Sequence, residues 1–214
     1  MSDNAQVYIA GWKTPADWAG FRETLAIGGE AEPWRRAFKE FFRTRLDLRY
    51  FNPIRILQDH GTLQGEGFSI LALQCTLIEF LESTVQGVNY RFLRHGEKLG
   101  PHEYSSSSDL FVGFLCTREP FARDFDKALA RDFYTDVRCG LLHEACTKGG
   151  WRVWAESPDG AVINPKLCTV YRNNLQKALD EFIRWYEAEL PKNADLQKAF
   201  IRKLDYLCQE AMTS

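Results

Sequence analysis

The sequence lacks a strong charge of either sign, and its first residues show no recognisable export signal. Its 214 residues include 27 basic and 29 acidic side chains, which gives a formal net charge of −2. This balance disfavours a protein that holds nucleic acid through its whole surface, although a local basic patch is compatible with it. The first residues form neither a basic nor an apolar segment. We therefore expect no secretory signal and a cytoplasmic protein.

The cysteines lack the spacing of a metal site or a redox motif. No two of the six form a C-x-x-C pair, which argues against a zinc ribbon and a thioredoxin-like centre. Their number is low for a disulfide scaffold in a chain of this length, so we expect free thiols. A run of about 18 apolar residues is also missing, and we expect no membrane-spanning helix. No metal and no other cofactor is predicted.

The sequence does contain ample material for a buried core. Hydrophobic residues make up 45% of the chain and aromatic residues 14%, which is more than a disordered chain carries. Their spacing predicts a mainly helical protein, with breaks at proline and glycine. We expect a long loop at 86–108 and a short helical turn between Pro53 and Gly61. The predicted helices cover about residues 15–26, 33–50, 68–85, 109–116, 120–148, 167–190 and 194–211.

One short β-hairpin is expected within this helical pattern. The apolar runs Trp151–Trp154 and Ala161–Ile163 flank the turn signal Ser157-Pro158-Asp159-Gly160, which favours a hairpin between the two runs. The predicted fold class is therefore mainly α, a helical bundle with a small hairpin. We expect residues 1–65 to form an N-terminal helical extension and residues 66–214 the bundle, together in one compact unit.

The most informative segment places an arginine and a histidine near the end of the longest helical pattern. It reads Asp136-Val137-Arg138-Cys139-Gly140-Leu141-Leu142-His143-Glu144. The segment resembles the R-x4–6-H signature of the HEPN superfamily, small helical bundles that are often metal-independent ribonucleases. An earlier predicted helix carries Glu79, similar to the acidic residue on a neighbouring bundle helix in several HEPN families. The resemblance covers about residues 66–190 and implies a HEPN-like bundle that forms a homodimer.

The resemblance also implies a simple chemistry. Arg138 would bind the RNA phosphate through two hydrogen bonds, and His143 would transfer protons near neutral pH, without a metal. On a straight α-helix the two side chains lie about 140° apart. We therefore expect a cleft at a two-fold axis in which two protomers each supply the pair. The expected products are a 2′,3′-cyclic phosphate and a 5′-hydroxyl.

Four residues around this pair are predicted to support it. Asp136 stands seven residues before His143 and therefore shares its helical face, from which it would orient the imidazole. Cys139 is a departure from the family pattern, because HEPN nucleases often carry a polar Asn, Asp or His directly after the arginine. The four supporting candidates are Asp136, Glu79, Cys139 and Glu144.

A basic helix face is a second candidate for RNA contact. The alternative is an ordinary solvated face, which is the commoner meaning of such a charge run. The residues are Arg35, Arg36, Lys39 and Arg43. A second Arg–His pair with the same spacing, Arg55 and His60, lies in a short segment between a proline and a glycine, and we interpret it as a coincidence.

Three functions are compatible with the sequence. The first is a HEPN-type endoribonuclease, with a toxin or an antiviral effector as the expected biological role. The second is a non-catalytic HEPN-like module that dimerises or binds RNA or nucleotides. The third is a helical interaction protein in which Arg138 and His143 are structural. The expected partners are a second copy of the chain, an RNA substrate, and an antitoxin or regulatory protein, without a membrane.

Overall fold

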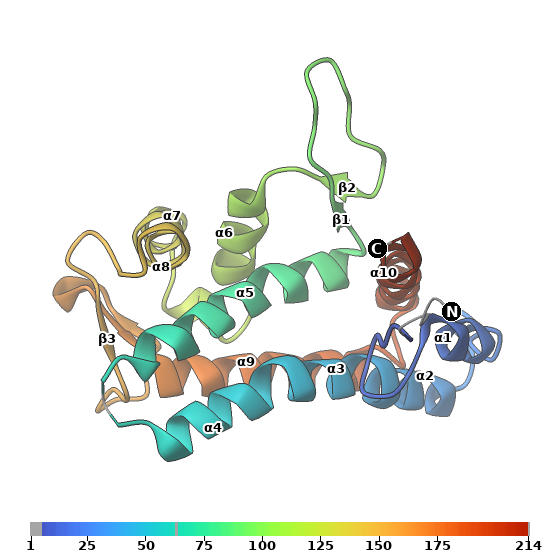
Figure 1. Cartoon of the computed structure of the whole chain (residues 1–214), viewed down its shortest axis with the longest axis horizontal. Helices are drawn as coiled ribbons and strands as arrows, with labels where there is room; N and C mark the ends of the chain where they lie inside the picture. Colours follow the sequence, from blue (N-terminus) through green and yellow to red (C-terminus); the bar gives the residue numbers. More distant parts are fainter. Residues whose placement is uncertain (1–5, 63, 214) are drawn as a thin grey trace, which may run out of the picture. The chain divides into compact units, whose positions relative to one another are not determined.

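The computed structural model describes residues 6–62 and 64–213, and the chain is mainly helical (Figure 1). It divides into two compact units, each built from separate stretches of sequence. The terminal unit comprises Met1–Asn52, Ser83–Ser105 and Tyr186–Ser214, and the motif unit comprises Pro53–Glu82 and Ser106–Trp185.

This division differs from the contiguous one expected at residue 65. Two long helices, α5 (Glu66–Gln86) and α9 (Arg172–Glu189), each run from the motif unit into the terminal unit. Both helices were predicted from the sequence, at 68–85 and within 167–190. Hydrophobic periodicity shows where a helix lies but carries no information about a change of packing partners along it.

The terminal unit begins with a capped helix. Thr14 Oγ1 accepts the N–H of Asp17, and the Asp17 carboxylate accepts the N–H of Thr14 at 2.7 Å, which satisfies two N–H groups at the helix start. The elements of this unit are α1 (Pro15–Arg22), α2 (Ala31–Ala37), η1 (Phe38–Arg43), α3 (Thr44–Leu46), η2 (Asp47–Phe51), β1 (Asn89–Tyr90), β2 (Glu103–Tyr104) and α10 (Ala194–Thr213), with the ends of α5 and α9.

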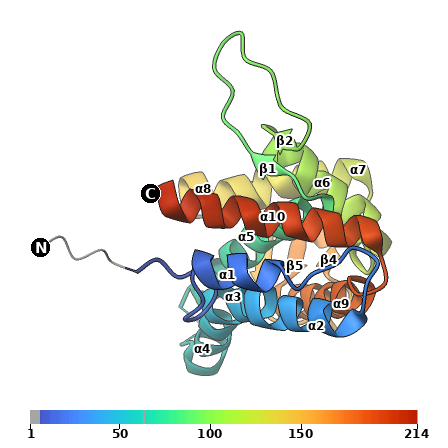
Figure 2. The same cartoon turned by 90° about the vertical axis from the view of Figure 1, so that its right-hand side faces the viewer.

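Aromatic packing holds the core of the terminal unit. Helix α1 lies beside α10 (Figure 2), and Trp18 Nε1 donates a 2.7 Å hydrogen bond to Asp205 across this contact. The Trp18 ring meets Phe41 and Phe200 edge-on, with centroids 5.1 and 6.1 Å apart. Each such ring removes a large apolar area from water. Because Phe41 belongs to η1, the cluster holds α1 and α10 against η1.

The helical run of 31–60 passes through Pro53, where the sequence predicted a break. The π-helical turn η2 immediately precedes α4 (Asn52–His60), and the N–H of Asn52 bonds to the carbonyl of Asp47, five residues back. A proline ring clashes with the carbonyl four residues before it and has no N–H to offer that carbonyl. The wider π turn shifts the bonding pattern just before the proline, so the chain stays helical.

The motif unit contains the segment predicted to be active. Its predicted helix at 120–148 is shorter than expected, because Asp126 Oδ1 accepts the N–H of Leu129 at 2.8 Å and starts a new helix there. Ala145 ends the run in a left-handed conformation, with φ at 54°. The elements are α4, α5, α6 (Ser107–Thr117), η3 (Phe121–Arg123), α7 (Lys127–Asp132), η4 (Phe133–Arg138), α8 (Cys139–Glu144), β3 (Arg152–Trp154), β4 (Ile163–Asn164), η5 (Pro165–Leu167), β5 (Thr169–Tyr171) and α9.

The β-hairpin is formed by other strands than those expected. Strand β3 lies within the first predicted run and β4 overlaps the second at Ile163, but the two do not pair with each other, because β5 lies between them. Strand β5 pairs parallel to β3 and antiparallel to β4, so the hairpin is β4–β5. All three residues of β5 are buried. β-branched and aromatic side chains suit such a central strand, but all three residues lie within the helix expected at 167–190.

Among the described residues, α5 is the one helix that is both long enough and apolar enough to cross a membrane. Of its most apolar window, 61% is buried in the structure, as in the core helix of many globular proteins. Its carboxylates Glu79 and Glu82 form ion pairs with Arg138 and Arg118. Length and composition alone do not assign a bilayer to such a helix.

Candidate functional site

Arg138 lies at the end of η4 and is held from two sides. Its Nη2 stands 3.5 Å from Oε2 of Glu79 on α5, and its guanidinium carbon lies 5.3 Å from the ring centroid of Tyr134. The Arg138 and Glu79 side chains are both half-buried, at 21% and 18% exposed. The structure thus brings Glu79 to Arg138, and the pair restrains a cation that still reaches water.

His143 lies one helical turn further on and is exposed. Residues 139–144 are α-helical, so the angle of about 140° between the two side chains applies to the observed helix. Across residues 6–62 and 64–213, the imidazole makes no hydrogen bond or ion pair, and none joins it to Arg138. A single chain therefore presents the two groups separately.

The surroundings of Arg138 contain thiol and phenol groups rather than further charges. Arg138 Nη1 lies 4.0 Å from the sulfur of Cys139, the position where HEPN nucleases often carry a polar side chain. Burial raises the pKa of Tyr134, which the neighbouring guanidinium opposes. Burial also raises the pKa of Cys75, on α5, to about 12. Both groups stay protonated at neutral pH, so neither supplies a nucleophile.

Asp136 and Glu144 support the loop after α8 rather than the imidazole. The carbonyl of Asp136 accepts the N–H of Lys148 at 2.8 Å, and its carboxylate occupies the place that a Cβ on Gly149 would take. Glu144 forms an ion pair with Lys148 at 3.2 Å. In the part of the chain that the structure describes, no hydrogen bond joins Asp136 to His143. The predicted orienting role of Asp136 is therefore not seen in this chain by itself.

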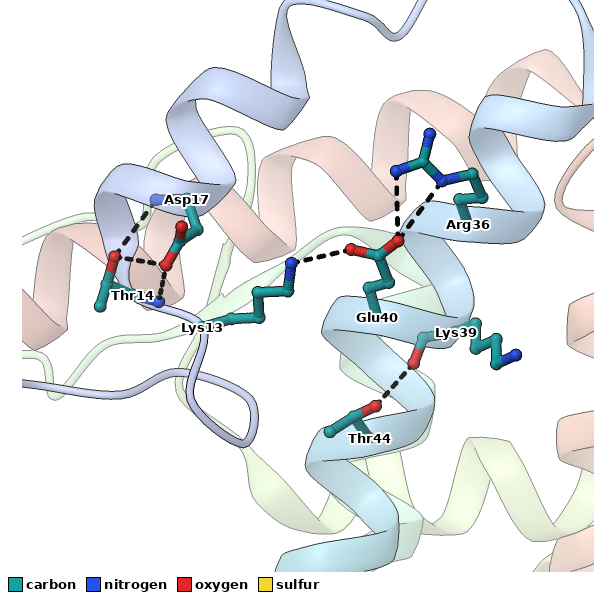
Figure 3. A network of polar contacts seen from close by, with 7 residues as sticks. All are labelled: Lys13, Thr14, Asp17, Arg36, Lys39, Glu40 and Thr44. Atoms are coloured by element: carbon teal, nitrogen blue, oxygen red, sulfur yellow. Dashed lines mark hydrogen bonds and ion pairs between the residues drawn. The ribbon is translucent and has the colours of Figure 1, made fainter.

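The basic face of the terminal unit is largely neutralised by carboxylates. Figure 3 shows Arg36 and Lys13 on the same carboxylate of Glu40, at 3.3 and 2.9 Å. The hydrogen bond from Lys13 is the main reason why the pKa of Glu40 is lowered. Figure 3 also shows the Lys39 ammonium directed away from this cluster.

The remaining two arginines of this face are paired as well. Arg35 stands 3.7 Å from Glu32, and Arg43 stands 2.9 Å from Asp47 and packs over the Phe51 ring. Exposed pairs of this kind attract phosphate less than unpaired cations do, because each carboxylate cancels a neighbouring charge. RNA contact at this face stays a prediction. Of its four basic side chains, Lys39 is the least neutralised.

Sequence reasoning missed a cleft beside this face. It has a volume of about 930 Å³ and includes Trp12, which is 84% exposed. In the structure Gly11 adopts a positive φ of 55° and Leu48 is exposed, and the sequence signals neither feature beyond the glycine itself. The lining is Ala10, Gly11, Trp12, Lys13, Asp17, Glu40, Thr44 and Leu48.

Two arginines of the motif unit were also missed. Arg118 donates from Nε and Nη2 to both carboxylate oxygens of the buried Glu82, at 2.8 and 2.9 Å. Arg172 is only 9% exposed and forms no ion pair within the described ranges 6–62 and 64–213. No local pattern marks either residue, since Glu82 precedes Arg118 by 36 positions.

The described residues offer no preformed metal centre. Among them, no group of three or more His, Cys, Asp or Glu side chains is placed to hold an ion. The six cysteines are free thiols, of which Cys75 and Cys208 are buried.

Comparisons with known proteins give this chain no established relative. No family model matches it, and neither the curated proteins nor the solved structures contain a match. The likeness to the HEPN superfamily therefore rests on the Arg138–His143 segment and on Glu79, and it stays a prediction.

Proposed function

We propose that this protein is a metal-independent endoribonuclease of the HEPN type that acts as a homodimer. One observation carries the proposal: the same helix end presents a guanidinium restrained by Glu79 and, one turn later, an exposed imidazole without a partner in the described residues. A restrained cation suits phosphate binding, and a solvent-accessible imidazole suits proton transfer near neutral pH.

The reaction uses the nucleophile that RNA carries. His143 accepts the proton of the 2′-hydroxyl while the bond from the 2′-oxygen to phosphorus forms. The bond from phosphorus to the 5′-oxygen breaks, and the leaving oxygen takes a proton from a water molecule, while the imidazolium of His143 later returns its proton to solvent. Arg138 donates two hydrogen bonds to the phosphate oxygens, where negative charge accumulates in the transition state. The products are a 2′,3′-cyclic phosphate and a 5′-hydroxyl.

The dimer is part of the proposal because one chain does not bring the pair together. A two-fold axis beside α8 sets Arg138 of one protomer against His143 of the other. Leu142, the residue before His143, is 63% exposed and would be covered in such a contact. Leu142→Glu is therefore expected to shift the protein to a monomer in analytical ultracentrifugation and to lower cleavage in parallel.

The direct test is cleavage of mixed RNA in the presence of EDTA. His143→Ala and Arg138→Lys are each expected to reduce the rate by about 100-fold or more, the usual contribution of such groups. Lysine keeps the charge beside Glu79 but loses the paired donors, so this variant should fold. His60→Ala, from the coincidental pair in α4, is the matched control and should cleave normally. Undiminished cleavage by His143→Ala would contradict the assignment.

A biological role as a toxin or antiviral effector belongs to the same proposal. RNA cleavage inside a cell should arrest growth when the protein is expressed alone, and His143→Ala should relieve the arrest. A chain that is active in vitro but harmless when expressed would point to an antitoxin or activating signal.

A second function, RNA or nucleotide binding without cleavage, is favoured by Cys139. The thiol 4.0 Å from Arg138 replaces a polar group that could align the reacting phosphate. Retained RNA affinity in EDTA, with no cleavage product and no change in the His143→Ala variant, would select this alternative. Cys139→Asn should then leave binding intact and create measurable cleavage.

A further inference from the structure

Arg172 is a buried cation that lacks a counter-charge. It is the first residue of α9, it is 9% exposed, and its Nη1 is buried without a hydrogen-bond partner. The described ranges 6–62 and 64–213 contain no ion pair to it. Burying a guanidinium costs hydration free energy that a carboxylate normally offsets, so an uncompensated one needs a reason.

The side chain of Arg172 runs along the first turn of α5. A Cβ built on Gly67 would lie 3.6 Å from Cδ of Arg172, 3.7 Å from its Nε and 3.4 Å from Val153. Because residue 67 is glycine, no side chain from this position covers the guanidinium. Helix α5 is 21 residues long. In its first turn the N–H of Phe68 donates to the carbonyl of Gly65 at 3.0 Å, while the N–H groups of Glu66 and Gly67 have no acceptor within the helix.

The charges around Arg172 do not neutralise it. Glu66, at the start of α5, accepts the N–H of Gln64 at 3.0 Å and forms no ion pair with Arg172. On the interior side, Gln74 Nε2 donates to the carbonyl of Arg172 at 2.8 Å and to Gln176 at 3.2 Å. Gln74 Oε1 is buried without a partner. Gln74 therefore contacts the backbone of Arg172, and within the described residues no carboxylate pairs with its guanidinium as Glu82 and Glu79 pair with Arg118 and Arg138.

We propose that Arg172 and the first turn of α5 form a binding site for a phosphate group. A guanidinium beside the N-terminus of a helix offers charge and N–H donors to the same anion, which is the arrangement that binds phosphate in many proteins. The unpartnered guanidinium is the feature that distinguishes this helix start from that of α1, where Asp17 serves as the anion. The site is independent of the proposed ribonuclease activity, since it is measured by binding alone.

One experiment can show whether the phosphate comes from the end of an RNA strand or from a small molecule. Free inorganic phosphate, a nucleoside monophosphate and the 5′-phosphate of an RNA strand all carry the same terminal dianion. If the RNA end is the source, a 5′-phosphorylated oligonucleotide should bind at least tenfold more tightly than the same strand with a 5′-hydroxyl. Equal binding of both strands, together with Arg172-dependent binding of inorganic phosphate, assigns the site to a small molecule.

The test is a titration of the full chain with sodium phosphate against sodium chloride of equal ionic strength. We expect phosphate, and not chloride, to raise the Tm, with a Kd for inorganic phosphate on the order of 1 mM. Arg172→Met should abolish the phosphate-specific shift and should have the higher Tm without phosphate, because the methionine buries no charge. Arg152→Met, an exposed arginine on β3, is the control and should bind as the unmodified protein does.

Gly67→Ala keeps the proposal testable if the Arg172 variant does not fold. The added methyl makes contacts no closer than 3.4 Å, so the variant should fold. It should weaken phosphate binding at least threefold by covering the guanidinium. Absence of any phosphate-specific shift in the unmodified protein, or the same affinity in Arg172→Met, would overturn the site and leave a bridging water as the partner of Nη1.

Discussion

Arg118 and Arg172 are two arginines of the motif unit in opposite electrostatic situations. Arg118 is 27% exposed and is paired through two hydrogen bonds with the buried Glu82. Arg172 is more deeply buried, and within the described residues no carboxylate pairs with its guanidinium. The fold around a buried ion pair needs both partners, because removing one leaves an uncompensated charge, whereas a buried arginine without a counter-charge lowers stability until an anion binds. The difference separates a structural arginine from a candidate ligand site.

The largest change in stability is expected when Arg118 is replaced. Arg118→Met leaves Glu82, whose side chain is 3% exposed, without its cation, and should cost about 3 kcal/mol of unfolding free energy. Urea denaturation measures the loss. The double variant Arg118→Met with Glu82→Met should recover most of it, since no buried charge is left. A loss below about 1 kcal/mol in the single variant would show that the pair is not structural.

The stability cost of replacing Arg138 is expected to lie between those of replacing Arg118 and Arg172. Glu79 is 18% exposed and its contact is longer, at 3.5 Å, so Arg138→Met should cost only about 1 to 2 kcal/mol. Chemical denaturation measures this cost. A loss as large as that of Arg118→Met would show that the Arg138–Glu79 contact is mainly structural.

Arg172→Met should change stability in the other direction. Replacing an uncompensated buried cation by an apolar side chain of similar length should raise the unfolding free energy by about 1 kcal/mol in phosphate-free buffer. Thermal and urea unfolding both report the gain. A loss of stability would mean that a water or another neutral group already satisfies the guanidinium.

The smallest expected effect is a loss of stability at high pH. Burial raises the pKa of Cys75 from 9.0 to about 12, so the folded state holds this proton more tightly than the unfolded state does. Its contribution is complete below about pH 9 and declines as the pH rises toward 12. We expect a decrease of about 1 kcal/mol between pH 9 and pH 10. Cys75→Ala should flatten this slope, and Cys146→Ala, at an exposed thiol, should not.

The sequence predicts the positions of the helices better than it predicts their tertiary contacts. Thr14 and Pro15 mark the start of α1 correctly, because a helix cap is a contact between near neighbours in the chain. Strand β5 was missed, since its three residues are too few to show a period and only burial between two strands defines it. Pro53 was taken as a break because the compensating π turn has no recognised local signature.

The residues of the candidate site can be read from the sequence as a prediction, whereas the contacts around them cannot. The spacing of Arg138 and His143 and the position of Glu79 are visible in the sequence, and the structure places Glu79 on Arg138. The contact of Asp136 with the Lys148–Gly149 turn is not visible, because it depends on the left-handed Ala145 that reverses the chain. Arg172 gives no sequence signal, since what defines it is a missing partner.

Mixing two inactive variants tests the proposed shared site most directly. In dimers of Arg138→Lys and His143→Ala protomers, one cleft keeps an intact arginine from one chain and an intact histidine from the other. Half of the dimers in an equal mixture are mixed, and each keeps one of two sites, so cleavage in EDTA should return to about one quarter of the unmodified rate. A mixture that stays as inactive as its two components, although exchange of protomers is demonstrated, would contradict the account.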